Sequence, residues 1–91
     1  MNKYVYTFHA EQKLKLPEIK GLGITKRKIQ KVIENSLALD KSEDPVYIVI
    51  GGLTDELSLC VAYREVEEGI RVITFYPAEK GRYESKILPG R

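Results

Sequence analysis

Residues 70–83 read IRVITFYPAEKGRY, and this stretch decides how the rest of the chain is interpreted. It begins as a β-strand, which Pro77 ends because proline cannot donate a hydrogen bond to the ladder. Lys80, Arg82 and Tyr83 follow just past the strand, where a rigid sheet holds side chains in solvent and they can meet a ligand. Cationic and phenolic groups gathered there favour a phosphate-bearing partner over a metal or an apolar ligand.

The preceding segments predict the other strands of a small sheet. Residues 57–64 alternate between large apolar side chains and smaller or polar ones, which is the period of a half-buried strand. Residues 46–50 form a continuous apolar run typical of a central strand. Turns at 51–56 and 65–69 would join these two segments to the strand at 70–76. The sequence therefore predicts a three-stranded antiparallel meander.

The N-terminal half predicts a short strand and two helices. Residues 4–8 favour the strand, and residues 9–16 favour a short helix that ends at Pro17. A longer helix follows the N-cap candidate Thr25, with apolar residues at 29, 32, 33 and 37 on one face, and Ile24 and Ile29 are spaced as a hydrophobic staple. Residues 18–23 and 40–45 are expected to be loops. The fold class is α+β, followed by a short basic C-terminal tail.

Size and composition limit the function classes. The 91 residues make one domain, 1–91, with little room for a deep pocket. No apolar run approaches the ~20 residues of a membrane span and no signal peptide is visible, so we expect a cytoplasmic protein without a membrane partner. One cysteine, Cys60, excludes an intrachain disulfide. With one Cys and one His there is no metal-binding cluster, and we expect neither metal nor cofactor.

Charge falls into three blocks along the chain. Residues 1–41 carry nine Lys or Arg against four Asp or Glu, residues 42–69 one against seven, and residues 70–91 five against two. If the basic blocks meet in the fold, they form one face that attracts a polyanion; the alternative is ordinary solvated charge. Lys26, Arg27 and Lys28 crowd the first turn of the main helix, where free N–H groups already favour an anion. We expect them to contact phosphate, unless they form a solvated turn.

These elements in this order resemble the BrnT branch of the RelE-like toxins, or an uncharacterised family close to it. The resemblance begins at GIT, residues 23–25, continues through VAYR, residues 61–64, and is closest at IRVIT, residues 70–74, followed by Ala78, Arg82 and Tyr83. The chain departs from the pattern in two positions and at its end. Tyr76 stands where such proteins carry an arginine, Leu22 stands where they carry a histidine, and the basic C-terminal helix is shortened.

The resemblance implies a toxin that cleaves mRNA without a metal, acts with or without the ribosome, and is neutralised by a cognate antitoxin protein that binds DNA. It implies charge stabilisation by arginines and proton transfer or base stacking by aromatic residues and the histidine: Arg64, Arg71, Arg82, Tyr76, Tyr83 and His9. We expect RNA binding at the basic residues Lys26, Arg27, Lys28, Lys80 and Lys86.

Several alternatives stay open. His9 could hydrogen-bond its own helical turn, and Arg71 could face solvent or pair with an acid such as Glu65. Arg82 and Lys86 could line a solvated turn. At the level of function, the alternatives are a non-catalytic RNA-binding or protein-interaction module on the same fold, and a structural subunit whose exposed sheet edge is its interface.

Overall fold

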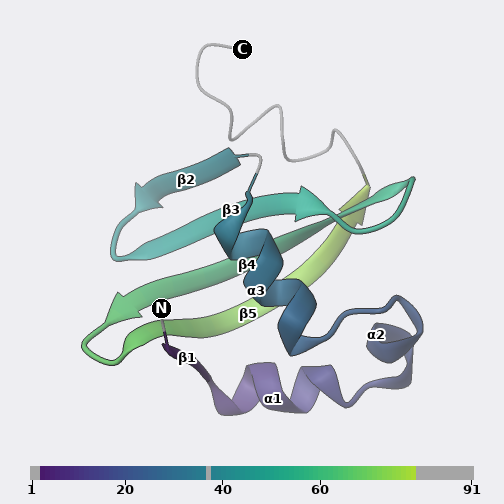
Figure 1. Ribbon diagram of the computed structural model, residues 1–91, viewed down its shortest axis with the longest axis horizontal. Coiled ribbons are helices and arrows are strands. Elements are labelled where there is room, and N and C mark those ends of the chain that lie inside the picture. The colour runs from purple at the N-terminus through teal and green to yellow at the C-terminus, as the bar shows by residue number, and fades with distance from the viewer. Residues whose placement is uncertain (1–2, 37, 80–91) are drawn as a thin grey trace.

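The structure is a computed structural model, and it describes residues 3–36 and 38–79 (Figure 1). In chain order the described elements are β1 (Lys3–Tyr6), α1 (Phe8–Leu14), α2 (Pro17–Gly21), α3 (Lys26–Glu34), β2 (Ala38–Glu43), β3 (Val46–Gly52), β4 (Leu57–Val66) and β5 (Gly69–Glu79). This arrangement confirms the expected α+β class.

The strands of the described chain form one five-stranded sheet in the order β1-β5-β4-β3-β2. The strands from β2 to β5 are antiparallel neighbours, whereas β1 joins β5 in parallel, from Lys3 opposite Gly69 to Tyr6 opposite Val72. The sheet therefore places the first and last described strands side by side, with β4 at its centre.

One face of the sheet carries the main hydrophobic core. Side chains alternate across a strand, so Leu59, Val61 and Tyr63 of β4 point to the same side. They belong to a buried cluster with Ile29 and Val32 of α3. In Figure 1, α3 crosses in front of the sheet and α1 runs along the β5 side of it. We call this side of the sheet the helix face and the opposite side the outer face.

The outer face is apolar at its middle and polar at one end. Ile50, Cys60 and Ala78 form a second, smaller buried cluster there, with Tyr76 packed against it. Cys60 is fully buried in this cluster. The expected half-buried character of this strand is wrong, because residues 58–63 are all buried. On the outer face Cys60 packs with Ile50, Ala78 and Tyr76 of the adjacent strands, which an alternating pattern alone does not predict.

Two segments that were expected to be loops are regular elements. The described chain has a third helix, α2, in the segment 18–23, because Pro17 begins a helix as readily as it ends one: the first helical position needs no N–H donor. The segment 40–45 contributes to strand β2, so the described meander has four strands where three were expected. β2 is an edge strand, and backbone pairing with β3 stabilises it without an apolar side-chain pattern.

A close approach between helix and sheet fixes the position of α3. A Cβ atom at Gly51 would lie 3.2 Å from both γ-carbons of Val32, closer than ordinary van der Waals contact. The N-cap of the helix is the predicted one, since the Thr25 hydroxyl accepts a hydrogen bond of 3.1 Å from Lys28 N. Ile24 and Ile29, the expected staple pair, are both buried in the main core.

Candidate functional site

Two arginines face each other on the outer face. Arg64 of β4 lies directly opposite Arg71 of β5, and both side chains are exposed. Within residues 3–36 and 38–79, neither forms an ion pair. The proposed pairing of Arg71 with Glu65 is wrong, because Glu65 lies opposite Ile70 and points to the helix face. Like charges directly opposite each other are unfavourable, and an anion between them would relieve the repulsion.

A β-bulge places Thr74 on the same face as Arg71. The register of the β4–β5 pair shifts between Ala62, opposite Thr74, and Tyr63, opposite Val72, so Ile73 is an additional residue. Without that shift, strict alternation from Arg71 would turn Thr74 toward the helices. Bulges redirect side chains in this way and are common near functional sites. Arg71, Thr74 and Tyr76 therefore share the outer face of β5.

Beyond the end of β1, helix α1 lies beside β5. The backbone N–H of Thr7 donates to Val72 O at 3.1 Å, and its hydroxyl donates to Ile73 O at 2.8 Å. One turn further on, His9 Nε2 lies 3.2 Å from Thr74 Oγ1. The interpretation of His9 as bonding its own helical turn is therefore wrong: Thr7 caps α1, and His9 contacts the strand. In Figure 1, α1 follows the edge of β5 beyond β1.

Lys13 completes the contact between α1 and β5. Its ammonium donates to Phe75 O and lies 5.9 Å from the ring centroid of Tyr76. Burial lowers the pKa of Lys13 below its usual value, because desolvation disfavours the charged form. Sequence reasoning missed this residue, although its spacing of four from His9 puts both side chains on one side of the helix.

A pocket of about 310 Å³ opens beside α1, lined by His9, Gln12, Lys13 and Leu16. None of these four residues is acidic. Since Lys13 reaches the ring of Tyr76, the pocket borders the outer face of the sheet. Its volume falls at the lower end of the range for small-molecule and cofactor sites, about 300–1,000 Å³. Two of the predicted catalytic residues, Arg71 and Tyr76, thus lie on β5, and a third, His9 of α1, contacts the same strand. Arg64 lies opposite Arg71 on β4.

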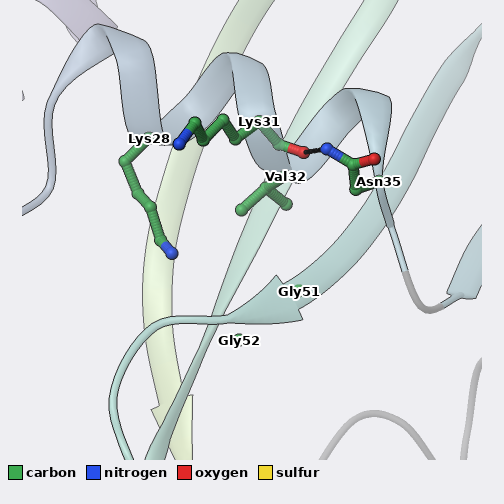
Figure 2. A pocket seen from close by; sticks show the side chains of 6 residues that line it. All are labelled: Lys28, Lys31, Val32, Asn35, Gly51 and Gly52. Carbon is green, nitrogen blue, oxygen red and sulfur yellow. Dashed lines mark hydrogen bonds between the residues drawn. The ribbon is translucent and has the colours of Figure 1, made fainter.

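The basic residues of α3 lie on the other side of the molecule. Lys26 forms an ion pair of 2.9 Å with Glu11 of α1, and its ammonium lies 4.8 Å from the ring centroid of Tyr6. It therefore ties α3 to its neighbours. Arg27 is exposed on the same helix. Lys28 lines a second pocket of about 170 Å³ with Lys31, Val32, Asn35, Gly51 and Gly52, and Figure 2 shows its side chain extending toward the end of β3.

The expectation of one basic face stays a prediction, because four of the five basic residues of 70–91 lie outside the described residues. The described residues place Lys26, Arg27 and Lys28 with the helices, whereas Arg64 and Arg71 lie on the outer face. A ligand of modest size cannot contact both groups at once. Four other predicted site residues, Lys80, Arg82, Tyr83 and Lys86, lie outside the described residues.

Two further observations concern the described part of the chain. No group of three His, Cys, Asp or Glu side chains is placed there to hold a metal ion. No helix there is long and apolar enough to cross a membrane.

No protein-family model, curated protein or solved structure matches the chain.

The arrangement is suited to a phosphodiester. The guanidinium fork of arginine matches two phosphate oxygens, and two such forks side by side hold one phosphate more firmly than either alone. From Arg71 to Thr74 the strand spans roughly 10 Å, at about 3.3 Å per residue. His9, the single histidine of the chain, is held at the far end of that span by its contact with Thr74.

Proposed function

We propose that the protein is a metal-independent ribonuclease of the RelE/BrnT-like toxin type, which cleaves mRNA and is neutralised by a cognate antitoxin protein. The observation that supports this most is the pair Arg64 and Arg71, which forms no ion pair among the described residues and lies on the same sheet face as the His9–Thr74 contact. An anion-binding pair beside a group able to transfer protons near neutral pH is what phosphodiester cleavage requires.

In the proposed reaction the ribose 2′-OH attacks the neighbouring phosphorus. His9 Nδ1, the ring nitrogen that does not contact Thr74, accepts the 2′-OH proton while the O2′–P bond forms. Arg64 and Arg71 stabilise the negative charge that develops on the non-bridging oxygens. The P–O5′ bond then breaks, and the phenol of Tyr76 protonates the leaving O5′. The products are a 2′,3′-cyclic phosphate and a 5′-hydroxyl, so the reaction needs neither water nor an external reactant in this step.

The experiment is cleavage of end-labelled mRNA by the purified protein in EDTA, with and without ribosomes. Replacing Arg71 by Gln should lower the rate roughly tenfold to a thousandfold, the range for one electrostatic stabiliser, and His9→Gln should lower it roughly hundredfold or more. The matched control is Arg27→Gln, an exposed arginine on α3, which should keep the wild-type rate. A folded wild-type protein that leaves RNA intact under both conditions would exclude cleavage.

One observation favours a second candidate, an RNA-binding module that does not cut. General acid–base cleavage uses two proton-transfer groups, and His9 is the single histidine of the chain. If Tyr76 is too weak an acid on the enzyme, the same face still binds a phosphate. The same assay then shows a shift of the RNA in a gel, sensitive to Arg71→Gln, without products.

A further inference from the structure

We infer that the pocket beside α1 binds an unpaired RNA base and that Phe8 stacks on an adjacent base, so that the protein selects single-stranded RNA. This inference rests on the proposed function only in taking RNA as the ligand. It concerns substrate recognition and does not require cleavage.

The first support is the exposure of large apolar side chains. Among the described residues three large hydrophobic side chains are exposed: Phe8 at 79%, Leu16 at 41% and Leu39 at 38%. Leu16 lines the pocket, and Phe8 begins α1 directly before His9, which also lines it. A single exposed apolar residue is ordinary, whereas two of them on the segment that lines a pocket indicate a binding surface.

Helical geometry places these residues in two rows. Phe8, Gln12 and Leu16 are spaced by four, so they lie roughly in line along α1 and the turn that follows it. His9 and Lys13 form the adjacent row, which contacts β5. At 1.5 Å per residue the outer row spans about 12 Å. The surface therefore presents the exposed ring of Phe8 at one end, and the pocket residues follow it along the helix and the turn: His9, Gln12, Lys13 and Leu16.

The chemistry of this surface fits a nucleobase. Stacking requires an exposed ring, which Phe8 supplies, and Gln12 has both donors and acceptors for the polar edge of a base. The ribose–phosphate backbone would continue along β5 toward Arg71 and Arg64. A partner protein fits less well, since the surface consists of a few side chains, whereas a stable protein interface buries about 800 Å² on each side.

The test measures binding of 2′-O-methyl RNA, which cannot be cleaved because its 2′-oxygen is blocked. A short oligonucleotide carrying 2-aminopurine reports stacking through its fluorescence. Phe8→Ala should weaken binding about five- to hundredfold, the value of one stacked base, while Phe8→Tyr should retain it. Leu16→Ala should weaken binding as well. Leu39→Ala is the matched control for Leu16→Ala, because the two leucines have similar exposed fractions and Leu39 lies on β2 at the opposite edge of the sheet.

The outcomes separate this inference from cleavage. Equal affinity for the single strand and its duplex, or equal effects of Phe8→Ala and Leu39→Ala, would overturn it, even if Arg71-dependent cleavage of ordinary RNA stands. Tight binding that depends on Phe8, with no cleavage of any RNA, would support it and remove the ribonuclease proposal. If Phe8→Ala changes only the binding of an antitoxin protein, the surface is a protein contact and the inference is wrong.

Discussion

At Tyr4 and Lys13 the same physical effect moves the pKa of two groups in opposite directions. Burial disfavours a charged side chain, so it raises the pKa of a tyrosine and lowers that of a lysine. The pKa of Tyr4 rises to about 12, first through burial and second through the hydrogen bond of 3.2 Å that its hydroxyl donates to Glu34 Oε2. That bond joins β1 to α3 and is lost once the phenol ionises.

Tyr4→Phe should therefore change how stability depends on pH. The folded-state pKa of Tyr4 lies above the ordinary value of 10.0, so its stabilising effect is complete below pH 10 and disappears as the pH rises toward 12. The free energy of unfolding of the wild type should fall over that window, and the fall should be smaller in Tyr4→Phe. Urea unfolding at pH 9 and at pH 11 measures this. Identical slopes for the two proteins would show that Tyr4 titrates normally.

The sequence was least informative about which side chains come together at the site. The sequence predicts four of its residues: Arg64, Arg71, Tyr76 and His9. Their shared location depends on the bulge at Ile73, which no local pattern predicts. Lys13 was missed because a lysine on a short amphipathic helix usually faces solvent. Its contact partner, Phe75 O, is 62 residues away along the chain.

Among the elements, those with a strong periodicity were predicted and those held by tertiary contacts were not. The N-cap Thr25 and the apolar residues after it predict α3, and the alternating residues predict β4 and β5. β2, by contrast, has the sequence ALDKSE and no apolar alternation. It is extended because β3 offers it a free edge, so its conformation is a property of the sheet.

The packing of α3 on β3 makes a prediction about two neighbouring glycines. Gly51→Ala would push a methyl group against Val32, which is buried and, being β-branched, has little rotamer freedom. Gly52→Ala meets nothing within 4 Å. Both changes reduce the conformational freedom of the unfolded chain equally. We therefore expect the free energy of unfolding of the Gly51→Ala variant to be roughly 1 kcal/mol lower than that of the Gly52→Ala variant. Chemical denaturation compares the two, and equal midpoints would mean that α3 adjusts without strain.

For the molecule as a whole, the separation of the two basic groups by the sheet predicts a particular salt dependence. RNA affinity falls with salt because bound phosphates release counterions, by about 0.7 in the logarithmic slope per phosphate of a single strand. Replacing Arg64 and Arg71 together by Gln should therefore lower the slope by roughly 0.7 to 1.4. Replacing Lys26, Arg27 and Lys28 together should leave it nearly unchanged.

Filter-binding titrations from low to moderate salt, with the non-cleavable oligonucleotide, give both slopes. The informative contrast is between the two variants, because the triple variant removes three positive charges from α3 whereas the arginine variant removes two from the outer face. If the triple variant loses as much slope as the arginine variant, RNA wraps around the molecule and contacts both faces.

The parallel pairing of β1 with β5 has a consequence for the order of events on the ribosome. β1 leaves the exit tunnel long before β5 is made, so it waits without its partner while more than 60 intervening residues are translated. The same is true of α1, which leans on the edge of β5 through Thr7, His9 and Lys13. A nascent chain that ends before β5 has its arginine on β4 but neither the opposing arginine nor the strand that holds the histidine. A protein that cuts mRNA would thus be inactive during most of its own translation. It could not cleave the mRNA that encodes it until β5 had joined the sheet.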